Sequence, residues 1–478
     1  MASKNITFDN IPASIRKPGK YLEFNTRLAV RTLPNNKQSM LIIGQKIAAG
    51  TIAQKIPTMV CSDADASTYF GAGSMCHLMT RAAIKANKYL DLTVIALDDA
   101  GAGVAASGTV TITGPATSAG ALTLYVANKR IDIAIAKDDA ANAIAAALNT
   151  ELCKHADLPV TAAVLNAVVT ITAKNKGLCG NDIGLGYELT NAAGVGVAIV
   201  AMAAGATNPT LQDALAAVFP EKYDIVVTPY NNQTDLTTLK THLDSVSGPL
   251  EQRPGVGVYG MNGALATATT LSAQVNSGRI LCIYQRYTST KRRSMPYEIA
   301  AAMGAVMAWE EDPAKPLNTL ALVGIAPADI AERLSRTEQE TLLYNGVTPL
   351  EIGPGEVVQI VRAISTYLKD AQNVDDISLL EITTIRTLDY VRKALRERYS
   401  LRFPREKKSV RVKAAIITET LDVLYKLQDL EILEAVDEWK SYVIVEDDLQ
   451  DPNRLNVRVP ADVVNGLHVL AARIDLFL

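Results

Sequence analysis

The most constraining feature of this sequence is a regular alternation of short apolar runs with amphipathic stretches. The runs have the length of buried strands, and the stretches between them repeat apolar residues at helical spacing. Strands that alternate with helices form βαβ units, in which helices cover a mostly parallel sheet. The predicted strands are residues 40–44, 90–97, 223–228, 256–259 and 280–284, and the predicted helices lie within residues 69–87, 211–218, 236–246, 264–275 and 294–308.

A segment of different composition interrupts this pattern. From Asp98 to about Asn208 the sequence has no Phe or Trp and is rich in Ala, Gly, Thr and Val. Exposed loops tolerate insertions best, so we expect a β-rich module, residues 98–207, inserted into a host α/β domain of residues 36–97 and 208–370. Within the module the sequence predicts strands at 109–113, 122–126, 131–135 and 168–172 and a helix at 139–152.

Both ends of the chain alternate like strands, although neither has an obvious partner in the sequence. One face of residues 21–30 is apolar, and the same alternation returns from residue 455. Each end is either an edge strand of the chain's own sheet or a strand donated to a neighbouring subunit. We therefore define an N-terminal arm, residues 1–35, and a C-terminal arm, residues 455–478. The apolar positions expected to make these contacts are Leu22, Phe24, Leu28, Val30, Leu455, Val457, Val459, Ile474 and Leu476.

The segment before the C-terminal arm, residues 371–454, is charged and amphipathic and predicts an α+β core. Helices are predicted at 385–399 and 415–426, and a strand at 442–445. The first helix combines an apolar stripe with basic residues that we expect to be exposed, namely Arg386, Arg392, Lys393 and Arg396. These cations form either a solvated face balanced by nearby carboxylates or a contact surface for an acidic partner.

Composition argues against several classes of protein. The net charge of −3 is unlike that of a general nucleic-acid binder, and no apolar run reaches the length that spans a bilayer. The N-terminus lacks the apolar stretch of a signal peptide, so we expect synthesis and assembly in a cytosol. Five cysteines without a C-x-x-C pair predict free thiols rather than a disulfide framework or a zinc site.

One motif is compatible with an enzyme. Gly255-Val-Gly-Val-Tyr-Gly260 matches the G-x-G-x-x-G pattern of dinucleotide-binding turns. Such a turn needs a strand before it and a helix opening within it, whereas here the apolar strand residues lie inside the motif. A strand preceded by a glycine turn is therefore favoured, and a cytosolic α/β enzyme that uses Gly255–Gly260 is the alternative. The four histidines lack metal-ligand spacing and no G-x-S-x-G is present, so we predict no catalytic, cofactor or metal site.

The order of four stretches carries a family resemblance. They are residues 253–280, 296–318, 343–367 and 451–478, beginning with Arg253-Pro-Gly-Val-Gly-Val-Tyr and ending with the C-terminal arm. This order resembles that of the contractile tail sheath proteins of bacteriophages, specifically the Mu-like group. The resemblance covers nearly the whole chain, and the inserted module resembles that group's outward-facing domain.

The resemblance implies a structural subunit that is not an enzyme and needs no cofactor. Copies would stack as six-fold rings around an inner tail tube protein, joined by exchange of the N- and C-terminal arms, with tail terminator and baseplate proteins at the ends. Relaxation of an extended, high-energy state would push the tube through the host envelope for genome delivery. The sheath would assemble in the bacterial cytoplasm and belong to the virion tail, with no nucleic-acid contact and no membrane insertion.

In this family a helix of the C-terminal core holds the tube. The resemblance therefore makes Arg386, Arg392, Lys393 and Arg396 the candidates for a tube-facing surface. A sheath of a tailocin or of another contractile injection system is a further alternative, which the sequence does not separate from a phage tail.

Overall fold

The computed structural model describes residues 16–22, 33–287 and 292–477. The chain forms two compact units. The larger unit holds residues 36–391, 431–435 and 461–478, and the smaller unit holds residues 392–430 and 436–460 together with the described residues up to Asn35. Within the described ranges, no helix has both the length and the apolar character needed to cross a bilayer.

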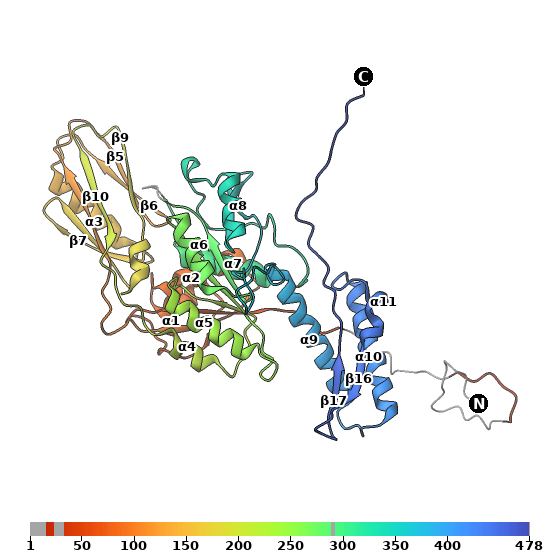
Figure 1. Cartoon of the computed structure of the whole chain (residues 1–478). Helices are drawn as coiled ribbons and strands as arrows, with labels where there is room; N and C mark the ends of the chain where they lie inside the picture. The colour runs from red at the N-terminus through yellow and green to blue at the C-terminus, as the bar shows by residue number, and fades with distance from the viewer. Residues whose placement is uncertain (1–15, 23–32, 288–291, 478) are drawn as a thin grey trace. The chain divides into compact units, whose positions relative to one another are not determined.

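An eight-stranded sheet organises the larger unit (Figure 1). Its inner strands run parallel, and an antiparallel strand closes each edge. The residues of β12 and β13 are buried throughout, which explains why these strands are continuous apolar runs rather than alternating ones. In spatial order the strands are β15 (Val357–Ile360), β14 (Thr348–Gly353), β13 (Ile280–Tyr284), β12 (Val256–Met261), β11 (Ile225–Val227), β1 (Ser39–Gln45), β3 (Asp91–Leu97) and β2 (Thr58–Met59).

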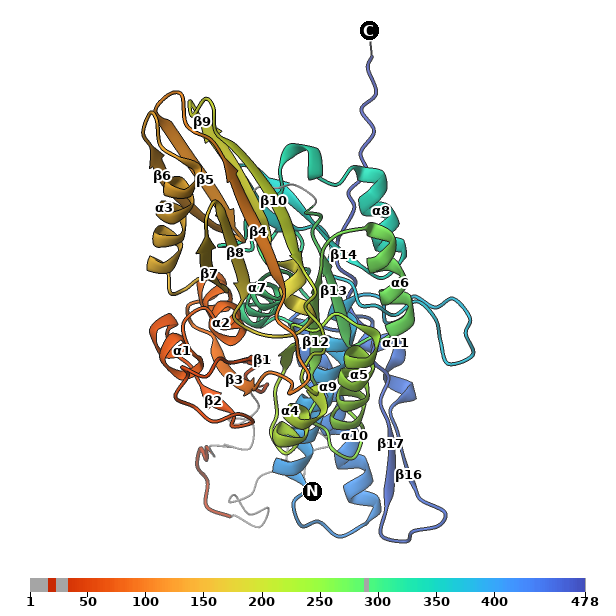
Figure 2. The same cartoon turned by 90° about the vertical axis from the view of Figure 1, so that its left-hand side faces the viewer.

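Helices cover both faces of this sheet (Figure 2). One face carries α4 (Leu211–Val218), α5 (Gln233–Val246) and α6 (Leu265–Val275), and the other carries α2 (Met75–Ala86) and α7 (Pro296–Trp309), with α1 (Asp63–Phe70) packed on α2. Two glycines of β12 show how close this packing is. A Cβ on Gly257 would come within 2.9 Å of Leu239 Cδ2 on α5, and one on Gly260 would come within 2.0 Å of the Pro296 carbonyl oxygen on α7.

Between β3 and α4 the chain forms two further sheets and one helix. The first sheet has the order β10-β4-β8-β7 and the second β6-β5-β9. Helix α3 (Ala141–Lys154) packs on the first sheet through Ile144, Leu148 and Leu152. The strands are β4 (Ser107–Thr113), β5 (Gly120–Val126), β6 (Lys129–Ile135), β7 (Val160–Leu165), β8 (Val168–Ala173), β9 (Leu185–Thr190) and β10 (Gly196–Ala203).

The smaller unit is built around a helix and a short hairpin. Helix α9 (Ile382–Arg402) ends in this unit and packs on α10 (Val410–Asp429) through a buried ion-pair network. Arg398 Nη1 lies 3.0 Å from Glu419 Oε2 and 3.1 Å from Asp422 Oδ2. After α11 (Val436–Trp439), the strands β16 (Ile444–Asp447) and β17 (Leu455–Arg458) form an antiparallel hairpin.

The predicted α/β and α+β architecture is confirmed, with differences in detail. Strand 280–284 and helix 211–218 have the predicted bounds. The helix-bearing stretch 69–87 contains the end of α1 and the whole of α2, because Gly71 and Gly73 adopt φ angles of 88° and 76° that end one helix before the next begins. Strands β7, β9 and β10 were not predicted.

Packing of α7 on β12 gives a prediction about stability. Gly260→Ala should lower the free energy of unfolding by about 1–3 kcal/mol, because its Cβ would overlap the Pro296 carbonyl and force the helix away from the strand. Gly101→Ala is the matched control, since a Cβ there meets no heavy atom within 4 Å. Denaturant unfolding of dilute subunits measures both variants, and equal stability of the two would contradict this packing.

Candidate functional site

The glycine motif lies in and just before β12, where its glycines make room for neighbouring protein atoms. A Cβ on Gly255 would come within 2.7 Å of the Tyr223 carbonyl oxygen, and the other two glycines are covered by α5 and α7 as described above. The next helix, α6, begins at Leu265, beyond the motif. A dinucleotide-binding turn needs a helix N-terminus within the motif, so Gly255–Gly260 does not form such a turn.

In a sheet of this topology, ligands bind where the strand order reverses, at the carboxyl ends of the strands. Here that place lies between β1 and β11. It is occupied by the residues where the inserted module joins the sheet, which we call the module root: Asp99, Asn175, Lys176 and Cys179. Gln45 Nε2 at the end of β1 donates to Asp99 Oδ1 (2.6 Å) and to the Lys176 carbonyl oxygen (2.7 Å). Asn175 Nδ2 donates to the Lys46 carbonyl oxygen (2.9 Å). Side chains that would face a ligand in an enzyme therefore bind the module.

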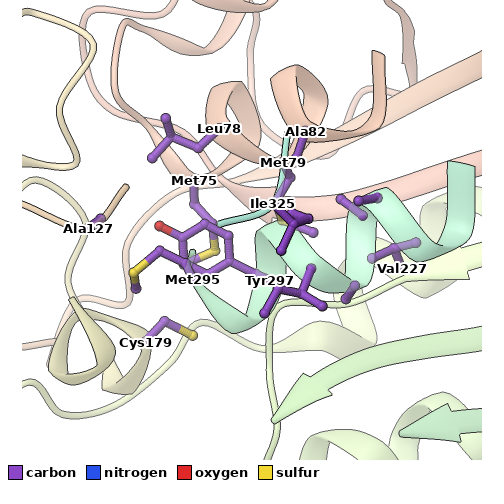
Figure 3. Close-up of a cluster of buried hydrophobic side chains, with 14 of the residues drawn as sticks. Met75, Leu78, Met79, Ala82, Ala127, Cys179, Val227, Met295, Tyr297 and Ile325 are labelled. Carbon is purple, nitrogen blue, oxygen red and sulfur yellow. The ribbon is translucent and has the colours of Figure 1, made fainter. Parts of the chain in front are cut away.

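Apolar side chains complete this closure. Cys179 of the module donates its thiol to the Pro229 carbonyl oxygen at 3.5 Å, just after β11. Figure 3 shows Cys179 and Ala127 on one side of a cluster that contains Met75 of α2, Met295 and Tyr297, with Val227 of β11 at its far side. The cavity that remains measures about 20 Å³, which is room for one water molecule and not for a cofactor.

Buried thiols and a buried imidazole in this region have no access to a substrate. Burial raises the pKa of the Cys76 and Cys179 thiols, which keeps both protonated and unreactive at neutral pH. Burial and the nearby Arg81 lower the pKa of His77, whose Nδ1 accepts from the Gly73 backbone N–H at 2.9 Å. His77 thus serves as a hydrogen-bond partner for the chain, and the described part of the sequence contains no cluster of three possible metal ligands.

The last described residues of the larger unit follow an anchor at His468. His468 Nδ1 accepts from Asn318 Nδ2 at 2.8 Å, and its Nε2 lies 3.4 Å from Glu381 Oε2, which anchors the chain at this point. Residues 469–477 form no helix or strand and are exposed. Ile474 is 96% exposed and Leu476 is 82% exposed, so apolar side chains of the predicted arm contact solvent in the isolated chain.

The start of the C-terminal arm has a different environment. Leu455 and Val457 lie in β17, which pairs with β16 of the same chain, and Val459 follows the strand. Residues 455–458 therefore pair within the chain, which is the first of the two alternatives left open by the sequence, and their predicted contact with a neighbouring subunit stays a prediction. The missed signal is the turn-rich stretch Asp447–Arg454, which joins two short runs as a hairpin loop. Of the N-terminal arm positions, Leu22 is exposed, while Phe24, Leu28 and Val30 lie outside the described residues.

The basic residues of α9 do not form one exposed set. Arg386 is only 7% exposed, which corrects the prediction for this residue. Its Nη2 donates to the Glu310 carbonyl oxygen at 2.6 Å, just after α7 ends, where carbonyl groups lack partners within the helix. Its burial against the end of α7, rather than its direction around the helix axis, separates Arg386 from the other basic residues of α9.

The other basic residues of α9 lie on a common face. Arg396 is four positions after Arg392 and three after Lys393, so it neighbours both on the helix surface. Arg392 and Lys393 are half-buried and Arg396 is exposed. Lys393 Nζ donates to the Asn35 carbonyl oxygen. These three residues remain candidates for a contact with an acidic partner.

Two family models and one curated relative match this chain. The family model of the phage tail sheath protein central domain matches residues 204–366, and that of the phage tail sheath C-terminal domain matches residues 374–477. The chain is 31% identical over 491 aligned residues to the Mu-like prophage FluMu tail sheath protein of Haemophilus influenzae, covering 99% of this chain and 100% of that protein.

Solved structures share the fold. The sheath tail protein of Desulfitobacterium hafniense superposes with a TM-score of 0.53 at 15% identity, covering 94% of this chain and 97% of that one. The helical sheath of the anti-feeding prophage in its contracted state gives a TM-score of 0.50 at 11% identity, covering 96% and 99% of the two chains. At these sequence identities, the similarity to solved structures shows a shared fold and nothing further.

The closure by Cys179 can be tested with a matched pair of substitutions. Cys179→Asp should lower the free energy of unfolding by about 3 kcal/mol or more, because it places a carboxylate in an apolar site without a partner. Cys153→Asp, at an exposed cysteine of the same module, should change it by less than about 0.5 kcal/mol. Thermal unfolding measures both. Similar melting temperatures for the two variants would show that the module root is not part of the host core.

Proposed function

Because the chain belongs to the phage tail sheath family, we propose that its copies polymerise around an inner tail tube by lending their terminal arms to one another. The protein is a structural sheath subunit of a contractile phage tail or a related injection system, and not an enzyme. Its copies would assemble in the bacterial cytoplasm as stacked six-fold rings, bounded by tail terminator and baseplate proteins.

The observation that carries this proposal is the exposed C-terminal tail. In an extended conformation Leu470, Ile474 and Leu476 share one side, since alternate residues face the same way. All three are exposed. Side chains of this kind are stabilised when another surface covers them, and each buried leucine or isoleucine side chain contributes about 1.5–3 kcal/mol. A tail of this composition is suited to bind another copy as an added strand.

The hairpin of the smaller unit offers an acceptor for such a strand. Within the described residues, β16 and β17 pair only with each other, over the four pairs from Ile444–Arg458 to Asp447–Leu455. A two-stranded hairpin is marginally stable in water, and each of its edges carries unpaired main-chain groups. Strands donated by neighbouring copies would satisfy those groups. The same exchange, repeated between copies, would join rings into a continuous mesh.

Contraction in this proposal needs no nucleotide. The place where a doubly wound sheet binds ligands is filled by the module root, so the free energy has to come from contacts between copies. Growth on the tube would hold the copies in an extended arrangement, and their repacking in a shorter one would release free energy. Arms tied by main-chain hydrogen bonds would keep neighbouring copies joined while the other contacts change.

Truncation beyond the His468 anchor tests the C-terminal arm. Deletion of residues 469–478 should leave the melting temperature unchanged and abolish the tubes seen by negative-stain electron microscopy, because it removes the donated strand without touching β17. Deletion of residues 1–30 should have the same effect for the N-terminal arm.

A matched pair of variants separates strand donation from nonspecific adhesion. Replacing Leu470, Ile474 and Leu476 with Ser should prevent tubes, whereas replacing Arg473 and Asp475 on the other side with Ala should not. Tubes of normal length from either truncation would contradict donation by that arm.

Contact with the tube is proposed for Arg392, Lys393 and Arg396. Charged contacts at a surface are individually weak, about 0–1 kcal/mol each, but a sheath repeats them in every copy. Such contacts would hold an acidic tube before contraction and would release it together. Arg386 has no part in this surface, because its guanidinium stabilises the end of α7.

Charge reversal tests this surface. Replacing Arg392, Lys393 and Arg396 with Glu should abolish co-assembly with the tube while isolated subunits still polymerise, because the contact with an acidic tube becomes repulsive. The same reversal at Lys129, Lys137 and Lys154 of the inserted module is the control and should leave co-assembly intact. Normal extended tails from the α9 variant, judged by electron microscopy of assembled tails, would refute the assignment.

A further inference from the structure

A pocket of about 450 Å³ opens at the amino ends of β1 and β3, on the side of the sheet opposite the filled crevice. Two aromatic side chains form part of its wall. Tyr89 is 80% exposed and Trp309, the last residue of α7, is 59% exposed. Their ring centroids are 6.0 Å apart with an interplanar angle of 31°. Large aromatic side chains exposed in this way are typical of binding surfaces, where they contribute much of the affinity.

The charges around the pocket leave one carboxylate without a counterion. Lys37 Nζ lies 3.1 Å from Asp91 Oδ2, and Lys315 Nζ lies 3.0 Å from Glu310 Oε2, so these charges are paired. Glu311 is exposed, and its side chain forms no ion pair with any described residue. An aromatic wall beside a free carboxylate is the arrangement that binds a lysine or arginine side chain, through cation–π attraction and a charged hydrogen bond.

We propose that this pocket binds a basic side chain from the N-terminal arm of another copy of the chain. The segment Arg16-Lys-Pro-Gly-Lys20 carries three cations and no acidic residue, and all of its residues are exposed. Its charge is complementary to that of the pocket. The inference rests on the proposed arm exchange and extends it, since the pocket would hold the segment that precedes the predicted strand of residues 21–30.

The residues that follow the N-terminal arm in the sequence line this pocket. Asn36 Nδ2 donates to the Glu311 carbonyl oxygen at 2.6 Å, and the next residues, Lys37 and Gln38, line the pocket. The pocket is therefore the place where one arm leaves and another arrives. Each copy would then hold the arm of one neighbour beside the root of its own, which links successive copies into a chain of identical contacts.

Trp309 reports on its own pocket. The sequence has two tryptophans, so Trp439→Phe leaves Trp309 as the single tryptophan. In that variant, acrylamide quenching of the emission should be about fivefold weaker in tubes than in dilute subunits, because a bound side chain covers the ring. Tubes that carry Arg16→Ala, Lys17→Ala and Lys20→Ala in addition should keep the strong quenching of free subunits. The matched control is a Trp439→Phe variant that carries Lys129→Ala, Lys137→Ala and Lys154→Ala in place of the arm substitutions. In its tubes Trp309 should stay protected from acrylamide.

A peptide of residues 14–22 provides a second measurement that does not depend on polymerisation. Added to dilute full-length Trp439→Phe subunits, it should change the Trp309 emission saturably. The peptide concentration that gives half of the maximal change should rise several-fold at high salt. The peptide with Ala at positions 16, 17 and 20 should have no effect. The absence of a saturable change with the basic peptide would overturn the inference.

The remaining outcomes are distinguishable. Failure of the full chain to form tubes at all would refute the proposed function. Tubes in which Trp309 stays as exposed as in free subunits would leave arm exchange intact and overturn the pocket's role. Protection that persists in tubes of the arm variant would assign the pocket to another surface of the neighbour, and protection already present in dilute subunits would assign it to the chain's own arm.

Discussion

Unpaired main-chain groups of extended segments are the constraint on which the rest of this structure depends. The inner strands of the eight-stranded sheet are paired on both sides, and residues 319–322 form main-chain hydrogen bonds with the outer side of β15. The β16–β17 hairpin and residues 469–477 do not satisfy their main-chain groups within the described chain. In the proposed function, other copies of the chain would pair with this short hairpin and cover the apolar tail.

The crevice at the carboxyl ends of the parallel strands is filled by the chain itself. The module root hydrogen-bonds Gln45 and places Cys179 against Tyr297, so the carboxyl edge of the sheet is filled by protein. An enzyme of this topology keeps that edge open. Exposed apolar and aromatic side chains include those of the tail and of Trp309. In the proposed function, the free energy for contraction would come from contacts between copies.

Much of this fold follows from the sequence, and the exceptions have physical causes. Strands buried on both faces, such as β13, are continuous apolar runs that periodicity identifies at once. Strands β7 and β10 were missed because alanines interrupt their runs of β-branched residues, and alanine has low strand propensity. Arg386 was misjudged because sequence spacing cannot show that the end of α7 lies against this position of α9. The alternation of the tail is visible in the sequence, whereas the pairing of β17 with β16 depended on recognising the turn-rich stretch between them as a hairpin loop.

Helical reconstruction of assembled tubes by cryo-electron microscopy tests the central claim most directly. The account predicts that residues 469–477 of one copy run as an added strand along the β16–β17 hairpin of another, with Ile474 and Leu476 covered. A reconstruction in which each hairpin is bordered only by its own chain, and in which the tails remain in solvent, would contradict it.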